Sequence, residues 1–599
     1  MIEPRLVTLG DLFSDRGQYQ VPIYQRPYVW DKEEQWTPLW EDLRNTAQAH
    51  LKGQEAPHFL GAIVIELVSA QPGHVKEYAV IDGQQRLMTL QLLLAALRSV
   101  VEEISPGHSQ EVQKLLLNDG KHATGDLRLK VLPGEHDRPA FKQVLESPDG
   151  DVPLNAKGIP GAYGYFMGEI RRWVQPVNSI EHREAMLDAL QEATEGLLQV
   201  VSIQLDGSSD AQVIFETLNS RGADLTSLDL AKNALFRLAE KEATAEGEVS
   251  DLHASHWQPS LGDADYWLET VRQGRYTSER ADLFLMHWLT MKVGKPARVQ
   301  HLFADFRKEI LGRDPAPTAH ELIVELSKDA KTFRSFDSFD EGSVEGRFFR
   351  RLRLMDTTTL LPVALLLFRS EELDVDRRRR ALRALESWLV RRMLLGATTA
   401  HYNRLLASLL ETLNDQPNLE AADDVVIQAL RGYSNPTDTW PTDERVVTQI
   451  RTHGLYNWIN HKRIRILLEA SELQLADSGK SEQLPLPEKL SVEHAMPQNW
   501  QKNWPLPPEM DNEAGITERN ERINRLGNLT LVTSALNSSL SDSEWSVKRA
   551  ALAKHSQLLV NQLLCAQETW NDAAIDARSA ELAEIIVRSW PGSSSPEWD

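Results

Sequence analysis

The residues with the clearest chemical potential lie near the C-terminal end of the sequence, in two short motifs. Glu493 and His494 are adjacent in SVEHAMPQNW, and NRLGNLTLVTSALNSSL contains Asn528 and, nine residues further on, Asn537. A neutral histidine can deprotonate water, and an amide can hold its ring. A carboxylate and an amide oxygen can ligate a hard divalent cation. These residue types are sufficient to hydrolyse a phosphodiester with one metal ion, so the motifs predict a nuclease.

Short secondary-structure elements must bring these side chains together. The sequence predicts a strand over residues 490–493 that delivers His494 to a loop, and a second strand over residues 529–532. A helix with a polar cap is predicted over residues 542–554. This order of elements is that of a ββα nuclease finger.

In such a finger each of the four side chains would have a distinct role. His494 would be the general base that activates water, and Asn528 would orient its imidazole. Glu493 and Asn537 would hold Mg²⁺, or Mn²⁺ in its place, against the scissile phosphate. The alternative is that His494 caps a strand and that the asparagines are turn residues.

A second polar cluster lies in the N-terminal third of the sequence. VIDGQQRLMTL joins a strand predicted over residues 78–81 to a helix predicted over residues 87–100. A glycine turn and an arginine at a helix N-terminus suit a phosphate group. QVPIYQRPYVW, with a strand predicted over residues 21–24, supplies a second arginine and further polar groups. The nucleotide-binding candidates of both motifs are Tyr24, Gln25, Arg26, Asp82, Gly83, Gln84, Gln85 and Arg86. The alternative is an ordinary glycine turn before a helix, because the glycine patterns of the P-loop and of the dinucleotide-binding fingerprint are both missing.

The 599 residues are too many for one hydrophobic core. Strand and helix signals alternate over residues 1–240, helical spacing dominates residues 241–440, and the ββα pattern lies within residues 441–599. We therefore expect a multidomain α+β protein whose helical middle connects two functional ends. Cys565 is the only cysteine, which excludes a disulfide framework and a zinc site made of cysteines. The ending PGSSSPEWD is expected to be disordered.

The net charge of −22 excludes a protein that coats nucleic acid non-specifically, although a local basic surface can still bind phosphates. The first residues do not have the pattern of a signal peptide. The longest apolar run, residues 360–368, is too short to cross a bilayer. We expect no membrane partner and a cytoplasmic location.

Arginines are concentrated in the helical middle, over residues 347–353 and 377–392. On helices some of them would share a face and could meet a phosphate backbone. The candidate DNA contacts are Arg351, Arg391, Arg392 and, in the last predicted helix, Lys548. The alternative is a solvated face on which these side chains pair with the neighbouring acids.

Both groups of motifs resemble GmrSD-type restriction enzymes. EHAMPQ, GNLTLV and the segment from Trp545 to Lys548 are similar to the HNH-type C-terminal domain of that family, although Glu493 stands where many relatives have Asp or His. YQRPYVW, DGQQRLMTL and IFETLNSRGADLTSLDLAKN resemble the N-terminal domain, which has a ParB/sulfiredoxin-like fold. The resemblance implies binding and hydrolysis of a nucleoside triphosphate, ATP or GTP, and adds Asn219 and Arg221 to the nucleotide-binding residues.

The resemblance further implies a single-chain, fused form of a type IV restriction endonuclease. Such an enzyme cleaves phage DNA that carries modified cytosines, such as glucosylated hydroxymethylcytosine, and is stimulated by the nucleoside triphosphate. Nucleotide binding would gate the nuclease, for instance through the interface of a homodimer. A nucleotide-responsive DNA-binding regulator without cleavage and a nucleotide-controlled ribonuclease toxin are the alternatives.

Overall fold

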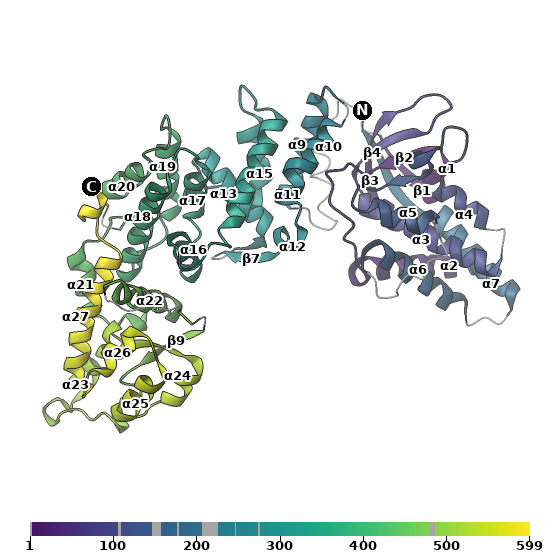
Figure 1. The fold of residues 1–599 in the computed structure, drawn as a ribbon. Helices are drawn as coiled ribbons and strands as arrows, with labels where there is room; N and C mark the ends of the chain where they lie inside the picture. The colour runs from purple at the N-terminus through teal and green to yellow at the C-terminus, as the bar shows by residue number, and fades with distance from the viewer. Residues whose placement is uncertain are drawn as a thin grey trace. The chain divides into compact units, whose positions relative to one another are not determined.

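The structure, a computed structural model, describes residues 3–54, 56–105, 109–146, 157–175, 179–205, 226–245, 247–273, 276–435, 437–478, 486–487 and 489–599. The chain divides into two compact units, Met1–Ser255 with Thr318–His320, and His256–Pro317 with Glu321–Asp599 (Figure 1). Helices and a six-stranded sheet confirm the multidomain α+β class. The predicted boundary near residue 440 lies inside the second unit, so the division into three domains stays a prediction.

A mixed sheet organises the first unit. The strand order is β1 (Glu3–Thr8), β6 (Leu198–Leu205), β3 (His58–Ser69), β4 (Lys76–Asp82), β2 (Gly17–Gln20) and β5 (Val131–Leu132). Neighbours β1–β6 and β3–β4 are antiparallel, and the other neighbouring strands are parallel. The described helices of this unit are α1 (Leu9–Ser14), α2 (Thr37–Leu51), α3 (Gln84–Ile104), α4 (Ser109–Leu116), α5 (Arg138–Glu146), α6 (Gly158–Val174), α7 (Ile180–Glu192), α9 (Ser227–Glu242) and α10 (Glu248–Leu252).

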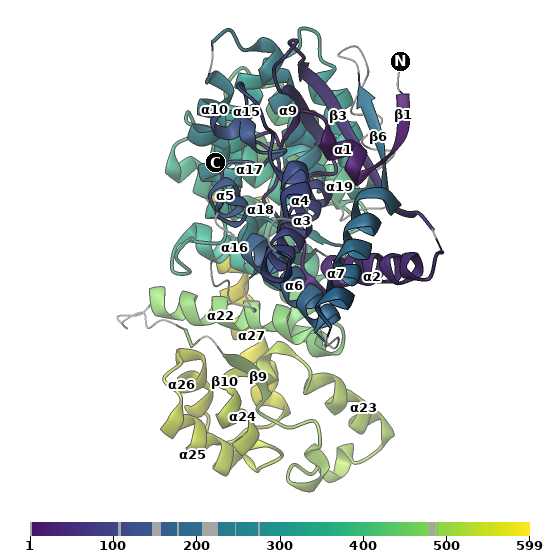
Figure 2. The ribbon, with the colours of Figure 1, turned by 90° about the vertical axis from the view of Figure 1, so that its right-hand side faces the viewer.

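Helix α3 is the centre of the core of this unit. Its residues 87–101 are all buried, because Leu, Val and Ala occupy most faces of the helix. It packs against α4, α5 and α6, and Figure 2 shows α4 and α6 beside it. The predicted strand and helix on either side of the DGQQR motif are thereby confirmed as parts of β4 and α3.

Gly83 forms the turn between β4 and α3. Its φ of 91° is left-handed, and a Cβ at this position would lie 2.8 Å from Cγ2 of Ile63. Only glycine therefore fits without strain. The strand predicted over residues 21–24 is wrong, since β2 ends at Gln20 and a turn follows. Pro22 explains the end of the ladder, because proline has no N–H to donate.

The second unit begins with helices and one hairpin. Its elements up to the C-terminal region are α11 (Gln258–Leu261), α12 (Ala264–Trp267), β7 (Thr270–Gln273), β8 (Tyr276–Glu279), α13 (Arg280–Val293), α14 (Leu302–Phe306), α15 (Ala319–Ser335), α16 (Val344–Leu354), α17 (Leu361–Arg369), α18 (Val375–Leu394), α19 (Tyr402–Asn414), α20 (Ala422–Gly432) and α21 (Asp443–Thr452). No helix in the described ranges is long and apolar enough to span a membrane.

The C-terminal region carries a two-stranded ladder. Its elements are α22 (His461–Ser478), β9 (Leu490–His494), α23 (Glu513–Arg522), β10 (Leu529–Thr533), α24 (Ser534–Leu540), α25 (Trp545–His555), α26 (Leu559–Cys565) and α27 (Asp572–Ser589). An isolated pair of strands is marginally stable. Here β9 and β10 pack against α22 and α24, and α26 packs against β10.

The last nine residues are ordered, so the expectation of a disordered tail is wrong. Trp598 is 2% exposed, its ring lies 5.5 Å from that of Trp440, and its indole N–H donates to the carbonyl of Gly592 at 2.8 Å. The burial of one large aromatic side chain outweighs the turn-forming composition of the segment.

Candidate functional site

Strand pairing places the acid and the histidine at one end of the β9–β10 ladder. Glu493 lies opposite Thr530, and His494 lies opposite Leu529. β10 leads directly into α24, which carries Asn537. Both strands match their predicted positions, and α25 corresponds to the helix predicted over residues 542–554.

The imidazole of His494 is buried and held from two sides. The residue is 9% exposed, and its Nε2 lies 3.2 Å from Oδ1 of Asn524. The ring of Tyr456 packs edge-on against it, with 4.6 Å between the ring centroids. Burial lowers the pKa of His494 to about 4, and the charge of Lys548 also lowers it, whereas Asn524 acts in the opposite direction. The ring is therefore neutral at neutral pH.

Asn524 also selects the tautomer of this ring. Its amide NH₂ donates to the carbonyl of Asn520 at 2.9 Å, which directs the amide oxygen towards His494. An oxygen can only accept, so Nε2 carries the proton and Nδ1 holds the basic lone pair. Within the described part of the chain, Nδ1 has no hydrogen-bond partner.

Asn528 has a different role from the one predicted for it. The side chain is completely buried, and its oxygen accepts from the N–H of Met496 at 2.8 Å and the indole of Trp570 at 2.9 Å. Its NH₂ donates to the carbonyls of Met496 and Ile523, each at 2.8 Å. These contacts fix the loop after β9, and Asn524 is the amide that reaches the ring of His494.

Glu493 is paired with a buried lysine. Nζ of Lys548 lies 2.6 Å from Oε1 of Glu493 and donates to the carbonyl of His494 at 2.8 Å. Burial raises the pKa of Glu493, with Lys548 opposing and the charge of Asp542 adding to the rise. Because Lys548 is 1% exposed, its burial contradicts both a surface contact with DNA and a solvated helix lysine.

Asn537 lies near the face of β9 that carries Glu493. Its NH₂ donates to Oγ of Ser491 at 3.1 Å, and residues 491 and 493 of a strand point to the same side. One carboxylate and one amide oxygen are hard ligands that suit Mg²⁺, which keeps several waters. The described residues contain no group of three or more His, Cys, Asp or Glu with metal-binding geometry. The donor set thus fits Mg²⁺ with water or phosphate as its remaining ligands.

The two predicted nucleotide-binding loops meet in the first unit. Gln84 donates to the carbonyl of Arg26 at 3.1 Å, and Gln85 donates to the carbonyl of Pro27 at 3.0 Å. Gln25 donates to a carbonyl of β4 at 2.7 Å. The glutamines therefore hold the loops together, and Oε1 of Gln84 is buried without a hydrogen-bond partner in the described structure.

The charged groups of this region lie at the start of α3. Oδ1 of Asp82 accepts from the N–H of Gly83 at 2.7 Å. Burial raises the pKa of Asp82, while Gly83 and the charges of Arg86 and Arg26 oppose the rise. Arg86 donates to the carbonyl of Ala62, and burial lowers its pKa.

The three remaining nucleotide-binding candidates are Tyr24, which contacts other residues, and two residues that the structure does not describe. Tyr24 is 3% exposed, stacks on Phe236 and directs its hydroxyl to Glu240 at 3.3 Å. Burial raises its pKa, so the hydroxyl stays protonated. Asn219 and Arg221 lie outside the described residues.

The structure also contradicts two of the predicted DNA contacts. Arg391 and Arg392 are 0% and 1% exposed. Arg391 donates to the carbonyl of Pro441 at 2.9 Å, and Arg392 donates to that of Thr398 at 3.0 Å. Their guanidinium groups therefore already donate to backbone carbonyls of the protein. Arg351, in contrast, lines a cavity.

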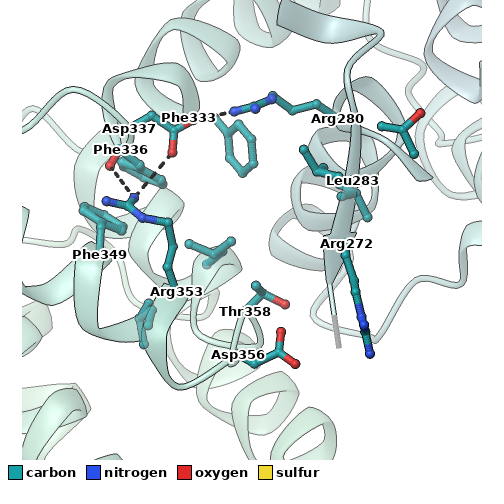
Figure 3. Close-up of a pocket in the computed structure, with 14 residues that line it drawn as sticks. Arg272, Arg280, Leu283, Phe333, Phe336, Asp337, Phe349, Arg353, Asp356 and Thr358 are labelled. Carbon is teal, nitrogen blue, oxygen red and sulfur yellow. Dashed lines mark hydrogen bonds and ion pairs between the residues drawn. The ribbon is translucent and has the colours of Figure 1, made fainter. Parts of the chain in front are cut away.

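A separate cavity of about 510 Å³ opens among the helices of the second unit. Phe336 and Phe349, whose rings stack 4.1 Å apart, contribute to its aromatic wall. Figure 3 shows Asp337 between two arginines, Arg280 at 2.6 Å and Arg353 at 3.4 Å. Aromatic surface beside guanidinium and carboxylate groups suits a planar, polar-edged ring.

Comparison with protein families agrees with both motif groups. Residues 9–236 match the model described as GmrSD restriction endonuclease, N-terminal domain, and residues 440–585 match that described as GmrSD restriction endonucleases, C-terminal domain. No curated protein matches the chain. The two matches cover well over half of the 599 residues, and they contain all the candidate catalytic, metal and nucleotide residues. The chain therefore belongs to the GmrSD restriction endonucleases, the type IV restriction enzymes.

Proposed function

We propose that this protein cleaves foreign DNA, such as that of a phage, at sites with modified cytosines such as glucosylated hydroxymethylcytosine. The reaction would need Mg²⁺ and would be stimulated by a nucleoside triphosphate. The chemistry is supported above all by the neutral, buried imidazole of His494, whose Nε2 is fixed by Asn524 while Nδ1 is left without a partner among the described residues.

In this mechanism His494 is the general base. Nδ1 takes a proton from water as the water oxygen bonds to phosphorus. The bond from phosphorus to the leaving oxygen breaks, and that oxygen takes a proton from solvent. The charge of Lys548 lowers the pKa of the imidazolium and thereby favours return of the proton to solvent.

The remaining residues of the finger hold the ion and the loop. Glu493 and Asn537 would bind Mg²⁺, which supplies positive charge to the phosphate in the transition state. Lys548 orients the carboxylate of Glu493 through its contact at 2.6 Å. Asn528 fixes the loop after His494 through its contacts with Met496.

The nucleotide would bind at the Gly83 turn of the first unit. A helix N-terminus with free N–H groups attracts phosphate, and the charges of Arg26 and Arg86 lie close enough to affect Asp82. The unsatisfied Oε1 of Gln84 would accept a donor from the ligand. Asp82→Ala and Arg86→Ala should each reduce nucleotide turnover, and wild-type turnover in both would place the nucleotide elsewhere.

The modified base would enter the cavity of the second unit. A nuclease that reads a base modification needs access to the base, and an extruded base can stack on aromatic groups. Asp337 and Arg353 would face its polar edge (Figure 3). Phe336→Ala should therefore reduce the preference for modified over unmodified DNA, and an unchanged preference would exclude this cavity.

The first experiment compares glucosylated hydroxymethylcytosine DNA, unmodified DNA and RNA, with Mg²⁺ and with or without ATP or GTP. Selective cutting of modified DNA that His494→Ala loses, with nucleotide turnover unchanged, is the expected result. Cutting retained in that variant would remove His494 as the base. Preferred cutting of RNA would indicate a ribonuclease toxin, and nucleotide turnover without any cutting would indicate a regulator.

A further inference from the structure

A polar cavity of about 470 Å³ lies between helices of the second unit. Four arginines line it from three helices: Arg347 and Arg351 from α16, Arg383 from α18, and Arg588 from α27. α16 packs against α18 and α22, and α22 packs against α27. The cavity thus joins the predicted helical connector to the C-terminal region, which contains His494.

Two of these four arginines are neutralised within the protein. Nη1 of Arg351 lies 2.9 Å from Glu386, and Nη1 of Arg383 lies 3.3 Å from Glu597. The guanidinium of Arg351 also lies 5.1 Å from the ring centre of Trp590, so it is held in place. These two pairs use two of the three acids that line the cavity.

Arg347 and Arg588 are the other two. Arg347 donates to the carbonyl of Gly342, and within the described ranges neither arginine has a carboxylate at ion-pair distance. Burial lowers the pKa of Arg347, the charges of Arg351 and Arg383 lower it further, and Glu386 and Asp477 oppose this. Positive charges gathered around one polar space repel each other, and an anion there would relieve the repulsion.

Most of the neighbouring arginines pair with acids of the protein. Arg378 has no carboxylate at ion-pair distance within the described ranges, but its guanidinium lies 4.6 Å from the ring centre of Phe368. Among those of the two arginine-rich segments, Arg350 pairs with Glu469 at 2.6 Å, and Arg380 pairs with Asp423 at 2.6 Å. Arg379 pairs with an acid of α16. The sequence contains an arginine-rich region, but internal ion pairs use most of its charge.

We propose that this cavity binds a phosphate group of the DNA backbone through Arg347 and Arg588, which rests on the proposed cleavage of DNA. Planar guanidinium groups match phosphate oxygens in pairs. The connection to the nuclease finger is α27, because Arg578 on that helix donates to the carbonyls of Gly527 and Leu529, each at 2.7 Å.

The spacing along α27 is compatible with one DNA substrate. Arg578 and Arg588 are ten residues apart on one helix, which corresponds to about 15 Å. Base pairs advance about 3.4 Å along a duplex. A phosphate in the cavity would then lie within roughly four to five base pairs of the level of the Gly527 turn, less than one turn of the DNA.

The test measures DNA binding against salt concentration in the full-length His494→Ala protein, which separates binding from cleavage. Each phosphate contact contributes about 0.9 to the slope of log K against log salt. Arg347→Ala and Arg588→Ala should each weaken binding and lower the slope, and the double variant, which loses the one phosphate contact, should lower it by about 1, for modified and unmodified DNA alike. Arg445→Ala, an exposed arginine of α21, removes the same charge and should leave the slope unchanged.

Three outcomes would overturn the proposal. An unchanged slope in the double variant, with the melting temperature preserved, would exclude a phosphate contact here. Loss of ATP or GTP binding with the slope unchanged would show that the phosphate comes from a nucleotide. Failure of the parent protein to bind any DNA would refute the proposed function as well. Recovery of the slope by Arg347→Lys, without recovery of full affinity, would support a paired guanidinium contact.

Discussion

Replacing Asn524 by alanine should slow DNA cleavage and leave both the fold and the DNA affinity unchanged. The substitution removes the oxygen that lies 3.2 Å from Nε2 of His494. The ring then loses the contact that fixes its tautomer and its plane. The carbonyl of Asn520 and the amide of Gln498, which also contact Asn524, are part-buried and remain within reach of water, so the main cost to stability is the loss of the acceptor for the buried Nε2–H of His494, about 1 to 3 kcal/mol.

The expected loss can be bounded from the nature of the contact. Removing a residue that orients a functional histidine typically costs about 10- to 100-fold, which is about 1.4 to 2.7 kcal/mol of activation free energy. The single-turnover rate at saturating Mg²⁺ and DNA should fall by this factor. Asn524→Asp should recover part of the rate, because it keeps an acceptor. Its negative charge should raise the pKa of His494 and move the acid limb of the rate profile to higher pH.

Asn528→Ala provides the matched comparison. It leaves the N–H and carbonyl of Met496, the carbonyl of Ile523 and the indole of Trp570 without their partner. Buried groups left unsatisfied cost about 1 to 3 kcal/mol each, and with partial relaxation we expect a loss of about 4 kcal/mol in unfolding free energy. A large fall in melting temperature therefore distinguishes Asn528 from Asn524.

The result that would refute this reasoning is a reversal of the two effects. If Asn524→Ala cleaves DNA within two-fold of the wild-type rate, the contact at Nε2 does not position the base. If Asn528→Ala keeps its melting temperature and loses only the rate, the amide acts on the ring after all. Both variants should be compared by the same single-turnover assay and by thermal unfolding.

Four further outcomes are expected from the same contacts. Lys548→Met should lower the unfolding free energy by about 3 kcal/mol, because it leaves buried Glu493 unpaired; Glu493→Gln in the same chain should restore stability in a thermal melt but not cleavage. Since the pKa of His494 is about 4 in the folded protein and ordinary in the unfolded chain, only the unfolded chain gains a proton there between about pH 6.5 and pH 4. As the pH is lowered through that window, the free energy of unfolding should decrease by up to about 3 kcal/mol. Denaturant titrations of His494→Gln should lack this part of the pH dependence. Gly83→Ala should lower the melting temperature, because its left-handed φ and the close Ile63 both oppose a side chain. EDTA should abolish cleavage and leave the melting temperature unchanged, whereas metal-dependent folding would give a large shift.

Local patterns in the sequence were sufficient for the elements that carry the site. Alternating apolar residues and a following polar motif located β9 and β10 within one residue. The same reasoning located β4, the Gly83 turn and α3. Such features depend on neighbours in sequence, so no knowledge of the rest of the chain was needed.

Contacts between distant residues could not be predicted in this way. Arg391 is buried because Pro441 and the segment at Trp590, far along the chain, provide carbonyl acceptors. Asn524 and Asn528 belong to the same NRLGN motif, and the side-chain amide of either could orient the imidazole of His494. Only the turn that places Asn524 beside His494 distinguishes them. The motif itself was the available signal, since its first asparagine precedes the Leu526–Asn528 turn and its last asparagine ends that turn.

Side chains from the surrounding helices hold the β9–β10 ladder in place. Arg578 of α27 donates to the carbonyls of Gly527, just before β10, and Leu529, its first residue, and Asn561 of α26 donates to the carbonyl of Leu531 at 2.7 Å. Glu472 of α22 accepts two N–H groups at the start of α26, each at 2.8 Å. Because these contacts are between protein atoms, we expect the positions of His494 and its loop to persist when a bound ion is removed. If Glu493 and Asn537 bind Mg²⁺ as proposed, the ion would serve catalysis and would not be needed to hold the fold.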